Sequence, residues 1–484
     1  MSRRLTATDA SFLYMETATS PMHISSLHVL EGDVDFDEVF QHFAERIHLV
    51  PAYRRKVAFV PFNLAHPTWE DDPDFDLTRH VKHHRLPPHA SMEKALDVAM
   101  ALNEPMLERD RPLWKVWVIS GLEDRTLLLM MTHHSMIDGV SGIELTTIIF
   151  DFDARGGNRE PPSAPWQPDE FPGAAQRVNA ALRDNLSAAR DNPPMRLMAD
   201  PERRHLLVRA GRVLRRFVTQ PVVTAPFNAG IVGRKRRLRY MMESFAEIRE
   251  IRRALGGTIN DVVLTVVSEA LARYLDACGE HTDEAYMRIL CPVSVRTEDE
   301  SGTLGNRVSA VFPVLPAWPM PVTQRLTAVC AEMERIKHDR EAQALALLLE
   351  AGAGIWPMAL APTQLVGTAW DPTRFAVNMP PPIVPKLGRR PPNFGVNFVC
   401  TNVPGVQVPQ YLAGHEVVEV IGIILLAGNV GFSMPIVSYT QQLCLSFFCV
   451  PRLLPDVEKL VDAARNAFTE LLTEARKHTQ QLAV

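Results

Sequence analysis

The sequence predicts an α/β protein made of two α/β regions joined by a polar crossover. Three observations carry this prediction. Strand-like and helix-like patterns alternate over residues 1–154, the composition changes at Arg155 to a stretch rich in proline, glycine and polar residues, and the alternation resumes over 241–484. We therefore expect an N-terminal domain over 1–154, a linker and basic crossover over 155–240, and a C-terminal domain over 241–484. A chain of 484 residues is long enough for this, at roughly 100–200 residues per domain.

The clearest elements of the first region form a β-hairpin followed by a helix. Residues 113–120 alternate between apolar and polar side chains, a turn follows at Gly121, and 126–132 is almost wholly apolar. This pattern predicts a hairpin whose second strand is buried on both faces. A helix is then predicted over 139–152, and the same criteria predict an earlier strand and helix at 26–30 and 36–47.

The second region has a helix pattern over 260–278, a strand pattern over 287–295 and a final helix pattern over 455–477. Between them, residues 371–392 are dense in proline, which removes backbone donors and excludes regular structure there.

Composition excludes several function classes. The net charge of −5 gives no reason to expect nucleic-acid binding. None of the six cysteines forms a C-x-x-C pair, so we expect reduced thiols of an intracellular protein. The N-terminus lacks the apolar region of a signal peptide, and the longest strongly apolar stretch, 420–432, is shorter than the roughly 20 residues that a spanning helix needs. We expect a protein that is soluble or lies on a membrane surface.

The crossover becomes basic between Arg196 and Arg239. Within it, arginines alternate with short apolar runs from Arg203 to Arg216. Two interpretations remain open: a solvated connector helix, or a basic amphipathic segment that rests on anionic lipid.

The segment that most suggests chemistry is 132–139, where the apolar strand ends in His133 and His134 and is followed by Asp138 and Gly139. Histidine exchanges protons near neutral pH. Adjacent side chains leaving a strand point in opposite directions, so only one of the two faces a given cleft. The spacing is not H-E-x-x-H, no third metal ligand presents itself, and no G-x-S-x-G elbow is present. Metal ligation and satisfied core histidines remain as alternatives, but a general-base histidine without a covalent nucleophile is favoured.

His133-His134-Ser-Met-Ile-Asp138-Gly139 resembles the HHxxxDG signature of the CoA-dependent acyltransferase superfamily, which includes chloramphenicol acetyltransferase and the condensation domains of peptide synthetases. Further short motifs, in order along nearly the whole chain, are similar to those of bacterial wax ester synthase/diacylglycerol acyltransferases, especially the mycobacterial-type triacylglycerol synthases: Asp9-Ala-Ser-Phe-Leu, Pro21-Met22-His23, Arg111-Pro112-Leu113-Trp114, Phe227-Asn228, Thr258-Ile-Asn260-Asp261-Val, Pro292-Val-Ser-Val-Arg296, Gly305-Asn306-Arg307 and Asn402-Val-Pro-Gly405. The proline-rich stretch 371–392 departs from that family's pattern.

The resemblance implies two chloramphenicol-acetyltransferase-like halves with an active-site tunnel between them. It implies transfer of a long-chain acyl group from acyl-CoA to diacylglycerol or a fatty alcohol, forming triacylglycerol or wax ester, without a metal or cofactor. His134 would be the general base, with His133 supporting it. Because lipid alcohols reside in membranes or droplets, we expect a cytoplasmic enzyme that binds peripherally to the inner membrane face or to lipid droplets.

The other motif residues are expected to act mainly through the structure around the histidines. Asp138 is expected to orient its loop, with Arg296 as its candidate partner. Thr258 and Asp261 have the spacing of a capping box around Asn260. Trp114 is expected to pack in the core, with acyl-chain contact as the alternative. Gly139 is expected to belong to the catalytic motif, where it permits a close backbone approach. The residues expected to support the motif or line the tunnel are Pro112, Leu113, Trp114, Asn260, Asp261, Arg296 and Asn402.

Two other functions remain as alternatives. One is a transferase of the same superfamily that takes acyl chains from a carrier protein. The other is a catalytically silent lipid-binding relative, against which the retained His134 and Asp138 argue.

Overall fold

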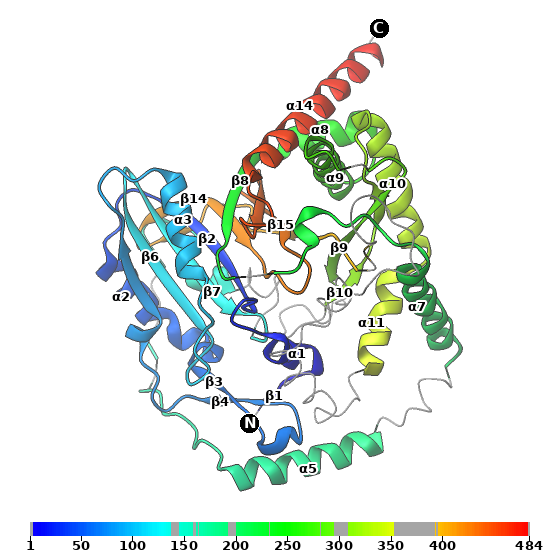
Figure 1. Ribbon diagram of the computed structural model, residues 1–484. Helices are drawn as coiled ribbons and strands as arrows, with labels where there is room; N and C mark the ends of the chain where they lie inside the picture. The colour runs from blue at the N-terminus through cyan, green and yellow to red at the C-terminus, as the bar shows by residue number, and fades with distance from the viewer. Residues whose placement is uncertain are drawn as a thin grey trace.

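The computed structural model describes residues 3–136, 145–157, 161–162, 164–191, 200–231, 233–280, 282–294, 308–352, 393 and 395–482. Its strands form two large sheets and a small one, with helices packed around them (Figure 1). Asp138, Gly139 and Arg296 lie outside the described residues, as do the first part of the helix predicted over 139–152 and the proline-rich stretch 371–392.

The N-terminal sheet has six strands in the order β13-β14-β2-β7-β6-β5. Their bounds are β2 (His23–Glu31), β5 (Val81–Arg85), β6 (Trp114–Leu122), β7 (Arg125–His133), β13 (Tyr411–Leu412) and β14 (His415–Ile423). β6 and β7 pair as an antiparallel hairpin, and β7 also pairs with β2. The predicted hairpin is confirmed, and so is the burial of its second strand: every β7 residue after Arg125 is buried.

Helices cover both faces of this sheet, which explains why β7 is apolar throughout. Its alternate residues Leu127, Leu129 and Met131 belong to one core cluster with α1 (Ala7–Met15) and α3 (Met92–Asn103). Leu128 and Met130 belong to another cluster, with α2 (Phe36–Arg46) and the helical residues 145–149. α2 matches the helix predicted over 36–47, and Asp35 caps it by accepting a hydrogen bond from Asp37 N.

Smaller elements complete the N-terminal half. A three-stranded sheet has the order β1-β4-β3, from β1 (Arg3–Arg4), β3 (Arg55–Ala58) and β4 (Thr68–Asp71). Short 3₁₀ helices, four here and one in the crossover, are η1 (Ile47–Leu49), η2 (Pro51–Arg54), η3 (Pro61–Asn63), η4 (Leu77–Arg79) and η5 (Pro226–Asn228).

The second large sheet has the order β10-β9-β12-β15-β16-β8, with β11 also paired to β9. Its strands are β8 (Arg237–Ser244), β9 (Tyr286–Ser294), β10 (Val308–Val311), β11 (Val314–Pro316), β12 (Phe398–Pro404), β15 (Phe432–Tyr439) and β16 (Gln442–Cys449). The helices of this half are α8 (Phe245–Leu255), α9 (Ile259–Ala277), α10 (Val322–His338), α11 (Glu341–Gly352) and α14 (Val457–Leu482). The predicted helix over 260–278 and strand over 287–295 are confirmed to within a residue, whereas the last helix extends beyond residue 477.

Two strands lie in a sheet other than the one that the expected domain boundaries imply. β14 follows the C-terminal strand β12 in sequence, yet it pairs with β2 in the N-terminal sheet. β8 begins at Arg237, inside the expected crossover 155–240, and belongs to the second sheet. The expected boundaries at 240 and 241 therefore do not separate the two sheets: β8 begins before them, and β14 lies after them but belongs to the N-terminal sheet.

Two helices lie in the crossover, α5 (Ala174–Asp191) and α7 (Pro201–Thr219). In Figure 1, α5 crosses the bottom of the molecule and α7 lies beside α11 on the right. The structure thus places the basic segment in a regular helix against the C-terminal half.

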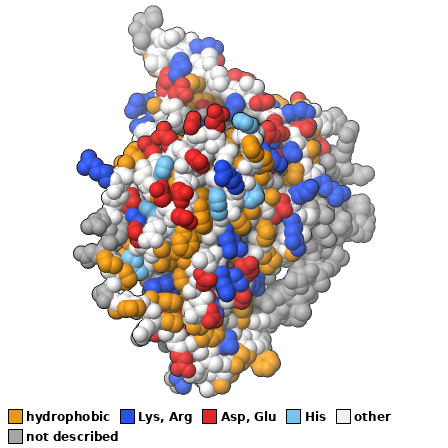
Figure 2. All heavy atoms as spheres, turned by 90° about the vertical axis from the view of Figure 1, so that its left-hand side faces the viewer, with side chains coloured by type: hydrophobic (Ala, Val, Ile, Leu, Met, Phe, Trp, Pro, Cys, Tyr) orange, Lys and Arg blue, Asp and Glu red, His pale blue; other side chains and the backbone are white. Residues whose placement is uncertain are grey.

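Within the described ranges, no individual helix has the length and apolarity to cross a bilayer, although α8 and α9, bent by 97°, reach that threshold as a pair. Figure 2 shows the face seen from the left of Figure 1. Acidic, basic and hydrophobic side chains are interspersed on it, without a field of one sign.

Candidate functional site

The first histidine of the motif is a core residue. His133 is the last residue of β7, pairs with His23 of β2, and its side chain is 0% exposed. Its Nδ1 accepts the Ser135 N–H at 3.1 Å and lies 2.7 Å from Ser135 Oγ. A backbone N–H can only donate, so Nδ1 is the acceptor of this contact, and Nε2 is the ring nitrogen left to donate. That nitrogen faces the carboxylate of Glu16 at 3.5 Å.

The second histidine turns away from the core. His134 is only partly buried, and its ring stacks on Phe12 with centroids 4.0 Å apart and planes 10° from parallel. Its backbone N–H donates to Met22 O at 2.8 Å. The expected divergence of the two side chains is confirmed. His133 fits the core-histidine interpretation, and His134 is the partly exposed member of the pair.

Glu16, which directly follows α1, is a buried carboxylate that sequence reasoning missed. Its side chain is 1% exposed. Oε1 accepts the Met22 N–H at 3.1 Å, and Oε2 accepts Arg109 Nη2 at 3.0 Å. Burial would raise the pKa of Glu16, but the interactions with His133, the Met22 N–H and Arg109 outweigh it and lower the pKa from 4.5 to about 2.

This shift predicts an acid-sensitive contribution to stability. The folded pKa of Glu16 lies below its unfolded value, so the contribution is complete above about pH 4.5 and is lost as the pH falls towards about 2. We expect wild type to be more stable than Glu16→Gln at pH 6, with the difference shrinking over that acid range. Urea unfolding at a series of pH values measures it. A difference that stays constant from pH 6 to pH 3 would contradict the assignment.

A sequence signal for Glu16 did exist. It lies between the motifs beginning at Asp9 and Pro21, where a carboxylate follows an apolar helix that starts with a cap at Thr6. Nothing local, however, indicates its partners. His133 and Arg109 lie far along the chain, and only the packing of α1 brings them together.

The Pro112-Leu113-Trp114 motif is brought to the site through its backbone. Leu113 O accepts the His133 N–H at 2.9 Å. Trp114 is 1% exposed, donates from Nε1 to Tyr53 O at 2.8 Å, and stacks between Tyr53 and His80. The core-packing expectation for Trp114 is confirmed, and its burial argues against direct acyl-chain contact.

The remaining candidate residues make no described contact with the two histidines. The capping box is confirmed: Thr258 Oγ1 accepts the Asp261 N–H at 3.2 Å, and Asp261 Oδ2 accepts the Thr258 N–H at 2.8 Å. Asn260 is half-buried in the first turn of α9, and Asn402 is exposed on β12. In the part of the chain that the structure describes, no recorded contact joins Asn260, Asp261 or Asn402 to either histidine.

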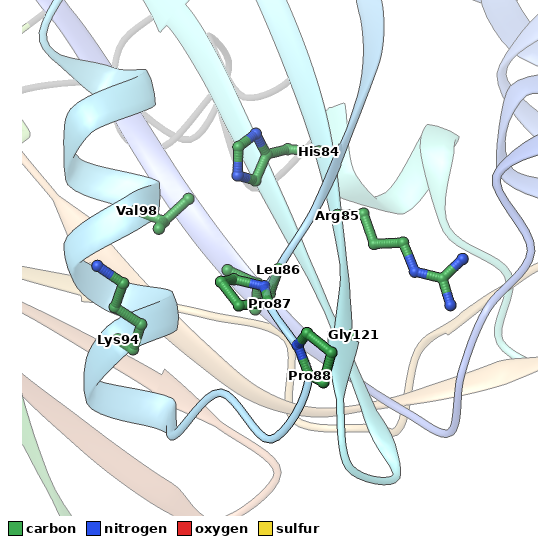
Figure 3. Close-up of a pocket in the computed structure, with 8 residues that line it drawn as sticks. All are labelled: His84, Arg85, Leu86, Pro87, Pro88, Lys94, Val98 and Gly121. Atoms are coloured by element: carbon green, nitrogen blue, oxygen red, sulfur yellow. The ribbon is translucent and has the colours of Figure 1, made fainter.

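One described cavity lies away from the two histidines. It measures about 760 Å³ and is lined by His84, Arg85, Leu86, Pro87, Pro88, Lys94, Val98 and Gly121 (Figure 3). The register of β5 and β6 places it at the turn end of the β6–β7 hairpin, whereas His134 follows the opposite end. Among the described residues, no group of three His, Cys, Asp or Glu side chains could hold a metal ion.

Comparison with known proteins identifies the family that the chain resembles. Residues 5–263 match the wax ester synthase/diacylglycerol acyltransferase catalytic domain, and 304–472 match the corresponding C-terminal domain. A putative diacylglycerol O-acyltransferase of Mycobacterium tuberculosis is 29% identical, covering 98% of each chain. The probable diacylglycerol O-acyltransferase tgs1 of the same species is 28% identical, covering 99% of this chain and 98% of the relative.

Solved structures match in fold. The wax ester synthase/diacylglycerol acyltransferase of Marinobacter aquaeolei has a TM-score of 0.64 at 21% identity, covering 98% of this chain and 99% of the other. The starter condensation domain of rhizomide synthetase has a TM-score of 0.58 at 12% identity, covering 98% and 94%. The two-domain chloramphenicol-acetyltransferase-like architecture expected from the sequence is therefore confirmed.

Proposed function

The chain belongs to the wax ester synthase/diacylglycerol acyltransferase family and is an acyltransferase, and on this premise we propose that it transfers a long-chain acyl group from acyl-CoA to diacylglycerol or a fatty alcohol. The observation that carries the proposal is the divergence of the two histidines at the end of β7. His133 is buried in contact with Glu16 and Ser135. His134 stacks its ring on Phe12 and remains partly exposed.

His134 is the proposed general base. It takes the proton of the acceptor hydroxyl as the oxygen attacks the thioester carbon. When the tetrahedral intermediate collapses, the C–S bond breaks and the protonated imidazole returns its proton to the departing CoA thiolate. Holding alcohol and thioester together removes the need for an acyl-enzyme, and one positioned histidine contributes typically about 10²–10⁴-fold. We propose Asp138 as the residue that orients the loop and Arg296 as its partner.

A product assay tests this function. Purified protein is incubated with radiolabelled palmitoyl-CoA and either hexadecanol or diacylglycerol, and products are separated by thin-layer chromatography. We expect labelled wax ester or triacylglycerol together with free CoA. Transfer from an acyl-carrier protein but not from acyl-CoA would support the carrier-dependent alternative, and no transfer from either donor would support the silent lipid-binding alternative.

We also propose that the outward face of α7 docks on an anionic membrane or droplet surface, where lipid acceptors reside. Val208, Leu214 and Val218 are 58%, 50% and 71% exposed. The exposed arginines Arg204, Arg212 and Arg215 lie on the same outward side of the helix. Apolar side chains flanked by guanidinium groups are typical of helices that lie in a membrane interface.

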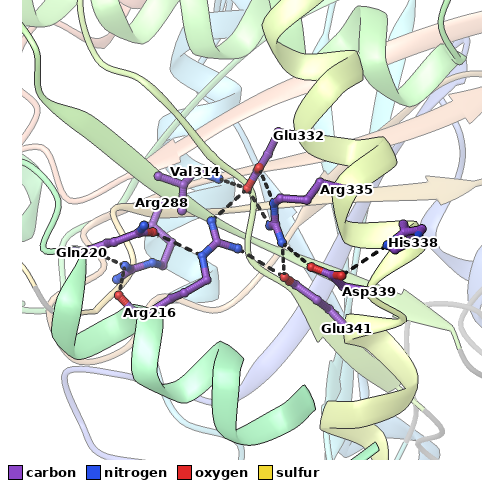
Figure 4. A network of polar contacts seen from close by, with 9 residues as sticks. All are labelled: Arg216, Gln220, Arg288, Val314, Glu332, Arg335, His338, Asp339 and Glu341. Atoms are coloured by element: carbon purple, nitrogen blue, oxygen red, sulfur yellow. Dashed lines mark hydrogen bonds and ion pairs between the residues drawn. The ribbon is translucent and has the colours of Figure 1, made fainter. Parts of the chain in front are cut away.

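Not every arginine of this helix is available for docking. Arg209 donates to His338 O, and Arg216 pairs with Glu332 at 3.4 Å and Glu341 at 3.2 Å. Figure 4 shows the Arg216 guanidinium directed at these two carboxylates, which Arg335 also contacts. These contacts attach the inner face of α7 to the C-terminal half, as expected for a connector helix. The docking proposal therefore concerns only the outward face of α7.

The docking prediction uses only the outer arginines. Arg204→Gln/Arg212→Gln/Arg215→Gln should lower binding to phosphatidylserine-containing vesicles, since each basic residue near an anionic surface contributes about 1 kcal/mol. Turnover of a short-chain, water-soluble alcohol should be unchanged. Vesicle co-sedimentation at low and high salt measures the binding.

The matched control carries the same change of charge elsewhere: Arg252→Gln/Arg253→Gln/Arg452→Gln, all exposed positions outside α7. It should bind vesicles as wild type does. Equal losses in both triple variants would show that net charge, and not the α7 face, governs binding.

A further inference from the structure

We propose that Phe12 and Glu16, one helical turn apart at the C-terminal end of α1, are positioning residues that hold His134 and His133 in their separate orientations. The proposal rests on the proposed function in taking His134 as the base. It adds that α1 orients this base from outside the HHxxxDG segment.

Phe12 restrains the ring of His134. The two rings are nearly parallel, with planes 10° apart and centroids at 4.0 Å. Stacking contacts the face of the imidazole, whereas proton exchange takes place at the ring edge, where its nitrogens lie. The contact therefore limits rotation of the side chain without occupying the atoms that carry out the chemistry. The Met22 carbonyl restrains the same residue through its backbone N–H.

Glu16 restrains His133 and Met22 together. Its Oε1 lies 3.5 Å from His133 Nε2 and accepts the Met22 N–H at 3.1 Å. The Met22 carbonyl in turn accepts the His134 N–H at 2.8 Å. One buried carboxylate thus contacts the residue before His134 and also holds Met22, whose carbonyl accepts the His134 backbone hydrogen bond.

Arg109 binds the end of α1 and the Glu16 carboxylate that follows it. It donates to Leu13 O at 2.7 Å and to Glu16 Oε2 at 3.0 Å. A cation at these last carbonyls also complements the negative end of the helix dipole. Because Leu13 is buried in the core cluster of β7, α1 is held against the strand that supplies the histidines.

The first experiment measures the positions of the histidines without turnover. Each variant is treated with diethyl pyrocarbonate, and the rate of carbethoxylation at His134 is followed by tandem mass spectrometry. We expect Phe12→Leu to raise this rate about 3–10-fold, because the ring loses its stacking restraint, rotates more freely and presents a nitrogen to the reagent more often. Phe12→Tyr keeps the stack and should stay within about 2-fold of wild type. Equal rates in wild type and Phe12→Leu would overturn the role of Phe12.

Glu16 is tested by a double-mutant cycle with His133. Glu16→Gln keeps an oxygen for the Met22 N–H but removes the charge that faces His133. We expect it to raise the labelling rate of His134 and to lower kcat about 10–100-fold, with an unchanged KM for acyl-CoA, because a small misplacement of a catalytic group is costly. In a His133→Gln background the same substitution should change neither quantity more than about 2-fold. Losses that multiply fully in the double variant would overturn the proposal.

Glu269→Gln is the matched control, since Glu269 is a buried, paired carboxylate on α9 that makes no recorded contact with either histidine. It should lower stability but leave His134 labelling unchanged. Increased labelling in this control would assign the Glu16 effect to general loosening and overturn the proposal. If wild type transfers no acyl group, the proposed function is wrong. The labelling rates of His134 in the variants still decide whether Phe12 and Glu16 position the histidines.

Discussion

His134→Ala is expected to lower acyl transfer by about 10²–10⁴-fold while the protein remains folded. The side chain is partly exposed and stacks on Phe12, so its removal leaves no large void in the core. The loss should appear in kcat, because the imidazole acts on the proton that moves in the transition state. Steady-state kinetics with hexadecanol and palmitoyl-CoA, together with the circular dichroism melting curve, measures both parts of the prediction.

His133→Ala is the natural comparison. It should retain more activity than His134→Ala but melt at a lower temperature, since it empties a site that is 0% exposed and removes a partner of Glu16. An inactive His133→Ala beside an active, normally stable His134→Ala would reverse the assignment of the base.

The largest expected effect on stability is at Arg325. Its side chain is 0% exposed, donates to Glu269 Oε2 at 2.9 Å, and also donates to the carbonyls of Pro316 and Trp318. Arg325→Met leaves a buried carboxylate and two carbonyls without this donor. We expect a loss of about 3 kcal/mol in the free energy of unfolding, the lower end for a broken buried ion pair, because Arg273 still contacts Glu269.

Urea unfolding followed by circular dichroism measures this loss. Glu269→Gln/Arg325→Met removes both charges and should recover part of the stability, since an unpaired buried charge costs more than a missing pair. Lys459→Met breaks the exposed pair with Asp456 and should leave the unfolding free energy unchanged within error. An Arg325→Met protein as stable as this surface variant would show that the buried pair contributes nothing.

Local patterns predicted the elements whose causes are local. The alternation over 113–120 and the apolar run over 126–132 gave β6 and β7, because a strand covered on both faces is apolar at every position. The capping box at Thr258 and Asp261 was predictable from a three-residue spacing, since both partners lie in one helical turn. The prediction that His133 and His134 diverge was equally local.

Partners distant in sequence were not predictable in this way. The pairing of β14 with β2 joins strands separated by most of the chain, and no pattern within either strand specifies the other. Likewise nothing in the local sequence of α7 tells its arginines apart. Only the packing against α10 and α11 separates the paired Arg216 from the exposed Arg212 and Arg215.

By itself, the sequence determined the α/β class, the hairpin, the two-histidine motif and the family resemblance, because each depends on residue type and short spacing. Only the tertiary structure decided which histidine is buried with a carboxylate, and that α1 and the residue directly after it contact the two histidines. The reason is physical: the orientation of a side chain at a strand end depends on what packs there. Here Phe12, Glu16 and Arg109 come from other segments of the chain.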